Sequence, residues 1–114
     1  MPVPLHQVKA ELFRTLGHPV RIRVLELLQD GPKPVRGLLA DIEVEASNLS
    51  QQLAVLRRAG LVTSSRDGAL VVYALRSAQV AALLAAARGI LSEVLNDRDD
   101  LRAQLRDDGT AVPA

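Results

Sequence analysis

Apolar side chains recur at helical spacing through the first part of the chain. The first stripe ends before Gly17 and consists of Leu5, Val8, Leu12, Phe13 and Leu16. A second helix is predicted to begin at Pro19, because the N–H that proline lacks would be unpaired at that position anyway. Residues 20–28 are apolar on most sides, so this helix should be the buried one. After the breaker cluster of residues 30–34, a short third helix is predicted from Val35, Leu38, Leu39 and Ile42.

A fourth helix is predicted around residues 47–58, and its two faces differ. At about 100° per residue, Leu49, Leu53 and Leu56 fall in one sector that must face the core. The outer face and its flanks are mostly polar: Ser47, Asn48, Ser50, Gln51, Gln52, Ala54, Arg57 and Arg58. Amides can form paired hydrogen bonds with adenine, hydroxyls can serve bases or phosphates, and a small alanine permits close approach to a groove. The arginines near the helix end suit phosphate contact, and the alternative for the whole face is simple solvation.

The start of this fourth helix is less clear from the sequence. Glu45 is a poor N-cap, and its charge would face phosphates unfavourably. Ser47 is the alternative cap and would start the helix later. In that case Ser47 is partly structural, and Gln51 is the surer base-reading residue.

A β-hairpin is predicted directly after the fourth helix. Gly60 stops the helix, and residues 61–63 and 70–73 are rich in β-forming side chains. The segment between them ends in Asp-Gly, which suits a tight turn and places Arg66 at an exposed tip. There its guanidinium could enter a minor groove, pair with phosphate, or simply be solvated. A short polar-faced helix followed by a hairpin is the layout of a winged helix-turn-helix, so the expected fold is mainly α with a small β-hairpin wing, in the order α-α-α-α-β-β-α.

A last apolar stripe begins near Ser77 and extends toward Leu105. It has no partner left within so small a chain, so pairing with the same helix of a second copy, helped by the first helix, is the economical explanation. Packing on its own domain is the alternative. The expected dimer interface comprises Leu5, Leu12, Leu83, Leu84, Ala87 and Leu91. The expected organisation is one domain over residues 1–108, with a DNA-reading part at 35–75, dimerisation helices at 4–16 and 77–106, and a flexible tail at 109–114.

Composition and charge narrow the function. The chain has 114 residues, 48% hydrophobic but only 2% aromatic, so the core must consist of Leu, Val, Ile and Ala. Net charge is only +1, yet residues 47–76 carry a net +3 and residues 77–114 a net −2, which concentrates positive charge on the reading segment. Without an uninterrupted apolar run of membrane-spanning length or a secretion signal, a soluble, cytoplasmic protein is expected.

The sequence offers little for catalysis or metal binding. Zero cysteines exclude disulfides, thiolate zinc sites and thiol switches, and no nucleophile with a base and no Walker-type loop is present. His18 lies at a helix junction, where a side-chain hydrogen bond is its expected role, and His6 is expected to be exposed. The acidic run of residues 97–100 is expected to be a solvated helix end rather than a cation site. We therefore expect neither an enzyme nor a cofactor.

The chain resembles the bacterial arsenic-repressor-type (ArsR) winged-helix regulators over roughly residues 5–95. The matching stretches are LFRTLGHPVRIRVLELL (12–28), VRGLLADI (35–42), SNLSQQLAVLRRAGLV (47–62) and RDGALVVYAL (66–75). The resemblance implies a homodimer on an inverted-repeat operator in double-stranded DNA, with each fourth helix in a major groove and the wings reaching flanking DNA. It also implies a repressor that an inducing ligand releases.

The metal sites of that family have no counterpart here. The resemblance places Pro34 and Arg36 where the family has its cysteine pair, and neither can replace a thiolate. The family's interfacial metal site corresponds to Ser77, Gln79, Ile90 and Glu93, of which only Glu93 has a suitable ligand atom. The expected function is a dimeric DNA-binding repressor without metal sensing. The alternatives are a winged-helix module that binds protein rather than DNA, and a DNA-binding sensor of an organic ligand.

Overall fold

The computed structural model describes residues 2–107. The chain forms two compact units, Met1–Ala81 and Ala82–Ala114. The first contains four helices, a small sheet and the start of a fifth helix, and the second contains the rest of that fifth helix. The tail expected at residues 109–114 lies outside the described residues.

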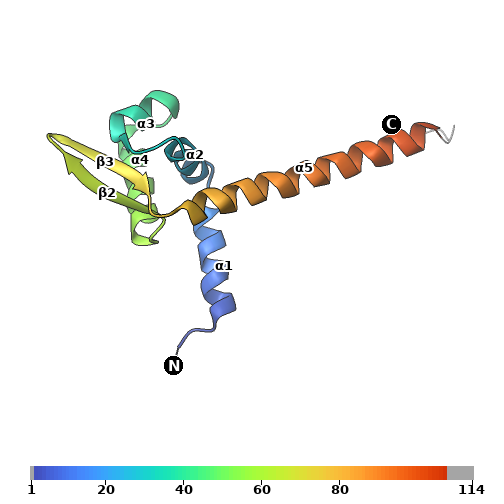
Figure 1. Cartoon of the computed structure of the whole chain (residues 1–114), viewed down its shortest axis with the longest axis horizontal. Coiled ribbons are helices and arrows are strands. Elements are labelled where there is room, and N and C mark those ends of the chain that lie inside the picture. Colours follow the sequence, from blue (N-terminus) through green and yellow to red (C-terminus); the bar gives the residue numbers. More distant parts are fainter. Residues whose placement is uncertain (1, 108–114) are drawn as a thin grey trace. The chain divides into compact units, whose positions relative to one another are not determined.

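Five helices are present in this part of the chain, at the places that the apolar spacing predicted (Figure 1). Their bounds are α1 Leu5–Leu16, α2 Pro19–Leu28, α3 Val35–Asp41, α4 Ala46–Arg58 and α5 Ala78–Asp107. Local capping explains several ends. His18 is the N-cap of α2, and its Nδ1 accepts a hydrogen bond from the Val20 N–H at 3.2 Å, as expected for a histidine at a helix junction. Gly60, which follows the C-cap Ala59 of α4, has φ +79°, and the Leu61 N–H donates to the Leu56 carbonyl at 3.0 Å, which closes the helix end.

The sheet has three antiparallel strands in the order β1-β3-β2, one more than the sequence predicted. β2 spans Val62–Asp67, β3 spans Leu70–Leu75, and the additional strand β1 is Lys33–Pro34, which pairs with Tyr73 and Val72. The element order is therefore α-α-β-α-α-β-β-α. Lys33–Pro34 was predicted only as part of a breaker cluster. Proline nevertheless fits here, because β1 lies at the edge of the sheet. An edge strand has one side that faces no partner strand, and a residue without an N–H is tolerated on that side.

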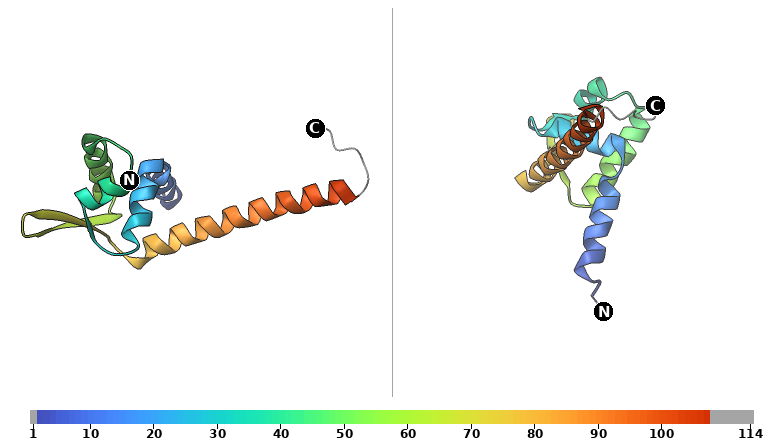
Figure 2. Two further views of the ribbon diagram at one scale, coloured as in Figure 1. Left: turned by 90° about the horizontal axis from the view of Figure 1, so that it is seen from above. Right: turned by 90° about the vertical axis from the view of Figure 1, so that its right-hand side faces the viewer.

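The turn of the hairpin is tighter than predicted. β2 continues to Asp67, which pairs with Leu70, so the loop is only Gly68 and Ala69. Gly68 has φ +63°, and Ala69 keeps a negative φ, a combination that fits a type II′ turn with glycine at its first central position. The two strands form a narrow ribbon that extends away from the helices of the same unit (Figure 2).

The core of the first unit is aliphatic, as the composition required. Its buried hydrophobic side chains are Leu16, Val24, Leu25, Leu27, Leu28, Leu38, Ile42, Leu49, Leu53, Leu56, Leu61, Val62 and Val80. Four of these belong to α2, so the prediction that the second helix is the buried one is confirmed. Only Leu16 of α1 is buried, which leaves most of the α1 apolar stripe on the surface.

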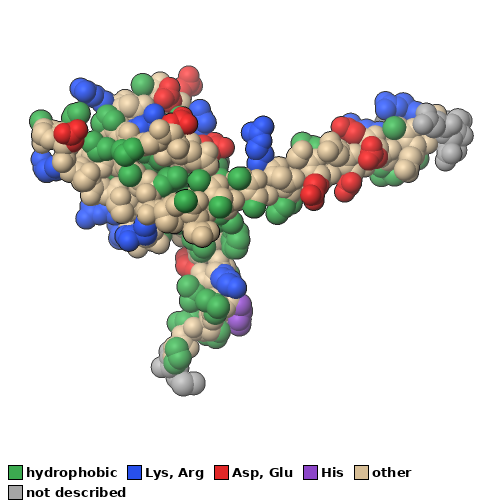
Figure 3. Space-filling view, in the orientation of Figure 1, with side chains coloured by type: hydrophobic (Ala, Val, Ile, Leu, Met, Phe, Trp, Pro, Cys, Tyr) green, Lys and Arg blue, Asp and Glu red, His purple; other side chains and the backbone are tan. Residues whose placement is uncertain are grey.

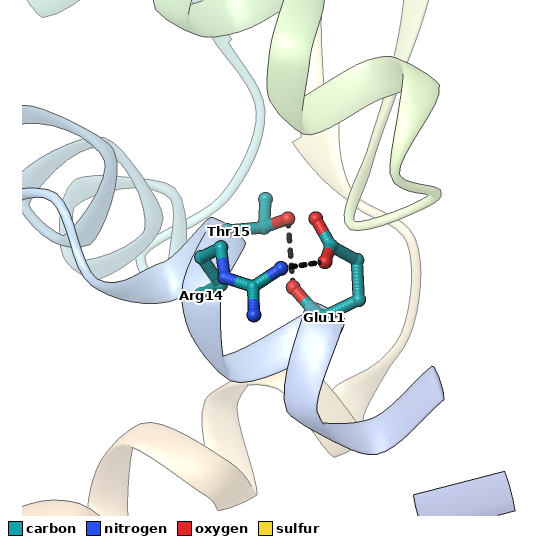
Figure 4. A network of polar contacts seen from close by, with 3 residues as sticks. All are labelled: Glu11, Arg14 and Thr15. Atoms are coloured by element: carbon teal, nitrogen blue, oxygen red, sulfur yellow. Dashed lines mark hydrogen bonds and ion pairs between the residues drawn. The ribbon is translucent and has the colours of Figure 1, made fainter. Parts of the chain in front are cut away.

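The remaining surface of α1 carries a local polar cluster (Figure 4). Arg14 forms an ion pair with Glu11, one turn earlier. The hydroxyl of Thr15 donates to the Glu11 carbonyl at 3.0 Å. Both interactions lie within the helix and on its exposed side, so they contribute little to holding α1 against other elements.

Helix α5 runs without interruption from Ala78 to Asp107. By length and composition alone it could cross a membrane, because it contains an 18-residue window of mean hydropathy 1.5, only 6% of which is buried. No membrane-spanning segment was expected, because no apolar run is long and uninterrupted. The mean hydropathy of this window is nevertheless high, although the window contains Arg88 and Glu93. A long, exposed apolar helix is also what an unpaired dimerisation helix presents.

Candidate nucleic-acid interface

Helix α4 is anchored by three leucines that have no solvent exposure. Leu49, Leu53 and Leu56 are each 0% exposed, so the predicted inner face is confirmed. The opposite side is accessible: the exposed side chains are Ser47, Asn48, Ser50, Gln51, Arg57 and Arg58, while Gln52 and Ala54 are half-buried. The structure therefore brings the predicted reading residues together on one helix whose orientation is fixed by the core.

The helix begins two residues earlier than the alternative with Ser47 as the N-cap predicted. Glu45 is the N-cap without a side-chain capping bond, and its carbonyl accepts the Leu49 N–H at 3.0 Å. Ser47 is thus the second helical residue rather than the cap, and its hydroxyl is on the exposed surface. The first turn therefore forms without a side-chain cap and is closed by the backbone bond from Leu49.

Gln52 is engaged within the protein. Its Oε1 accepts a hydrogen bond from Arg21 Nε of α2 at 2.8 Å, and its Nε2 donates to Asn48 Oδ1 at 2.9 Å. Arg21 Nη1 also donates to the Thr15 carbonyl at 3.0 Å. Arg21 was not predicted to belong to this surface, because it is separated by 31 residues from Gln52 and only tertiary packing brings the two together.

Basic side chains gather beside the reading helix. Arg57 and Arg58 form the last turn of α4 and are exposed. Arg66 is exposed too, but it lies within β2 opposite Val71 and not at the tip, because β2 extends to Asp67. In Figure 3, Lys and Arg side chains line the edge of the first unit near β2 and the C-terminal end of α4. These basic side chains can approach a polyanion at the C-terminal end of α4, whereas its N-terminal end is flanked by the exposed carboxylates of Asp41, Glu43 and Glu45.

The residues predicted to form a dimer interface lie on α1 and α5. Leu5 and Leu91 are 67% and 62% exposed, and Phe13, which shares the α1 stripe, is 58% exposed. Leu12, Leu83 and Leu84 are half-buried, and Ala87 is exposed. Large apolar side chains left on the surface in this way are typical of a protein–protein contact.

Within residues 2–107, no group of three or more His, Cys, Asp or Glu side chains is placed to hold a metal ion. Pro34 lies in β1, and Arg36 is exposed on α3. Glu93 is exposed on α5. His18, one of two histidines, is already committed through Nδ1 to capping α2. The chemistry that this surface offers is hydrogen bonding and positive charge.

Comparison with known proteins agrees with this geometry. Residues 18–64, from α2 into the first residues of β2, match a family described as bacterial regulatory protein, arsR family. The uncharacterized HTH-type transcriptional regulator Rv0081 of Mycobacterium tuberculosis is 50% identical over 110 residues, 96% of each chain. The crystal structure of Rv0081 matches with a TM-score of 0.79 and 52% identity, over 85% of this chain and 98% of that one.

Two further solved structures share the fold. The transcriptional repressor BigR from Xylella fastidiosa has a TM-score of 0.66 and 38% identity, over 71% of this chain and 83% of its own. The homodimeric winged helix-turn-helix DNA-binding domain Mb0332 from Mycobacterium bovis, a possible ArsR-family transcriptional regulator, has a TM-score of 0.74 and 26% identity, over 82% and 86% of the two chains. The helices and hairpin described above are therefore arranged as in winged helix-turn-helix DNA-binding domains.

Proposed function

The chain belongs to the bacterial arsR family of DNA-binding transcriptional regulators, and we propose that it acts as a homodimeric repressor that does not use the family's metal sites. The observation that carries the proposal is the outer face of α4. It presents short polar side chains along its length and two arginines at its end, and it is held in place by three fully buried leucines. A helix of this kind can enter a major groove with its polar face toward the base edges.

Each group on this surface has a distinct role in the proposal. Ser47, Asn48, Ser50 and Gln51 present hydrogen-bonding groups to the bases. Arg57 and Arg58 neutralise phosphates, which supplies affinity without sequence preference. Arg66, on the exposed side of β2, contacts the backbone or the minor groove beside the main site.

The dimer follows from the apolar surfaces of α1 and α5. Leu5, Phe13 and Leu91 are more than half exposed in the single chain, and burying such side chains contributes roughly 1.5–3 kcal/mol each. A second copy of the chain offers the same surfaces, as expected for a two-fold interface. The homodimeric state of Mb0332 supports this assignment. Two reading helices about 34 Å apart would then fit an inverted repeat.

The experiment is direct binding to DNA in solution. Purified protein is titrated onto its own upstream DNA and onto a scrambled duplex, at two salt concentrations, once with excess zinc and once with chelator. Selective binding that ignores zinc supports the proposal. Release by zinc would contradict the absence of metal sensing, and equally weak binding to both duplexes would contradict sequence-specific reading of that DNA.

A charge-reversed variant separates DNA reading from protein binding. Arg57→Glu together with Arg58→Glu should abolish binding to both duplexes, because phosphates would then face carboxylates. If the chain were a winged-helix module that binds protein instead of DNA, the unaltered protein would already bind neither duplex. Circular dichroism checks that the variant keeps its helices.

A further inference from the structure

A relay of three hydrogen bonds connects α1 through α2 to the reading helix α4. The Thr15 carbonyl accepts from Arg21 Nη1 at 3.0 Å, Arg21 Nε donates to Gln52 Oε1 at 2.8 Å, and Gln52 Nε2 donates to Asn48 Oδ1 at 2.9 Å. Arg21 and Gln52 are half-buried, whereas Asn48 is exposed on the outer face of α4. This relay therefore begins at the partly buried Thr15 and Arg21 and ends at the surface proposed to contact DNA.

The direction of these bonds is dictated by chemistry. A guanidinium carries only donors, so Gln52 must turn its oxygen toward Arg21. The Gln52 NH2 group then donates to Asn48, which must accept with its own oxygen. Amide orientation is otherwise ambiguous, because the oxygen and nitrogen ends have nearly the same shape. Through Gln52, Arg21 thus orients the Asn48 amide and leaves its NH2 group without a partner in this series of bonds.

Arg21 is itself held firmly in place. It reaches a carbonyl in the last turn of α1, where the negative end of the helix dipole favours a cation. The Thr15 hydroxyl donates to the Glu11 carbonyl (Figure 4), and the Thr15 carbonyl accepts from Arg21 Nη1. No ion pair to Arg21 occurs among residues 2–107, so its charge is available to strengthen the bond to Gln52.

We propose that Arg21 and Gln52 are positioning residues that make Asn48 a hydrogen-bond donor toward the major groove. With its oxygen bound to Gln52, Asn48 offers its NH2 group, and the paired contact with adenine, which needs both ends of the amide, is disfavoured. Guanine presents two acceptors, N7 and O6, at its major-groove edge. Asn48 then selects guanine at the base that it meets, and Gln52, predicted above as a reading residue, acts through Asn48 instead. This inference rests on the proposed function.

The test compares Arg21→Met with a matched control on the same helix. Arg23 is two residues away and is exposed, and its only ion pair in the described chain is with Glu26, so Arg23→Met removes the same charge without touching the relay. A library of random duplexes yields the site preferred by the unaltered protein. Every single-base variant of that site is then measured with each protein, including Asn48→Ala, which identifies the position that Asn48 contacts.

The unaltered protein should prefer guanine over adenine at the Asn48 position by roughly five- to tenfold, the low end of what a good paired base contact discriminates. Arg21→Met should remove this preference at that position alone, whereas Arg23→Met should leave the whole pattern intact. Arg21→Lys should retain most of the preference, since an ammonium also only donates. Should Arg21→Met fold poorly in a thermal melt, Gln52→Met breaks the same relay from the surface side and takes its place.

Several results would overturn the inference. Adenine preferred at the Asn48 position would do so, as would an Asn48→Ala variant with an unchanged pattern. Equal base patterns for Arg21→Met and Arg23→Met would also remove Arg21 from any positioning role. If the unaltered protein enriches no sequence at all, the proposed function fails as well, so the two failures can be told apart.

Discussion

The two arginines that end α4 make the strongest quantitative prediction about DNA binding. Arg57 and Arg58 are exposed in the last helical turn, beyond the base-reading positions. We predict that replacing each with glutamine weakens binding to operator and random DNA alike and flattens the dependence on salt. Glutamine is shorter than arginine but keeps a polar end and a similar helix propensity, so the main loss is that of the positive charge.

The magnitude follows from counterion release. Each phosphate neutralised on B-DNA contributes roughly 0.9 to the slope of log K against log salt. In a two-fold dimer every arginine counts twice, so Arg58→Gln alone should reduce the slope by about 1.8 and the double variant by about 3.6. At 0.1 M salt, with each contact taken to contribute nothing at 1 M, a single replacement corresponds to a loss of about 60-fold in affinity.

The assay is a fluorescence-anisotropy titration of labelled duplex at five salt concentrations. The control is Arg88→Gln with Arg98→Gln on α5, which removes the same charge from exposed positions outside the reading unit. Its slope should stay close to that of the unaltered protein. A double variant at Arg57 and Arg58 with an unchanged slope would refute the phosphate assignment, and a loss confined to the operator would make these arginines base readers instead.

Four further changes test reading, assembly and packing. Gln51→Ala should weaken operator binding by about 1–3 kcal/mol and random DNA much less, by competition titration; equal losses would remove Gln51 from the reading set. Leu91→Asp should shift the protein to monomer in analytical ultracentrifugation, whereas Asn96→Asp, about 140° around the same helix, should stay dimeric; two dimers would exclude this stripe. Leu53→Ala should lower the free energy of unfolding by about 3–5 kcal/mol, since its side chain is 0% exposed, and a loss below 1 kcal/mol would contradict its burial. Gly89→Ala should raise it by up to about 1 kcal/mol, because a Cβ there meets nothing within 4 Å in the single chain, and a destabilised dimer would instead reveal a partner packed on Gly89.

Local signals account for the parts of the fold that the sequence predicted correctly. Pro19 and Gly60 mark helix ends through their own backbone preferences, and the leucines of α4 face inward because of simple periodicity. None of these features depends on knowing what lies elsewhere in the chain. The helices and the approximate hairpin could therefore be placed before the structure was known.

The features that the sequence did not reveal arise from pairing between strands or helices, in two of three cases between distant segments. Lys33–Pro34 is a strand only because β3 lies beside it, and two residues are too few to show a period. Arg66 lies in a strand and not in the predicted turn, because the pairing of β2 with β3 continues to Asp67. Arg21 joins the reading surface through a contact with Gln52, which no spacing rule connects. The candidate site was thus predictable as a helix face but not in the hydrogen bonding that orients it.

The size of the reading helix explains why dimerisation and sequence reading belong together. Helix α4 has 13 residues and is therefore about 20 Å long, which spans about six base pairs at most. A site of six base pairs recurs by chance about once in 4,000, too often for selective control, whereas two such half-sites together recur about once in 17 million. Both figures follow from four bases per position and compare with the roughly 10⁶–10⁹ competing sites of a genome. Residues 2–107 contain one such helix, so the second must come from another copy. The exposed leucines of α1 and α5 supply the surface that would hold the copy, and the rigidity of that contact sets the spacing at which two half-sites are recognised.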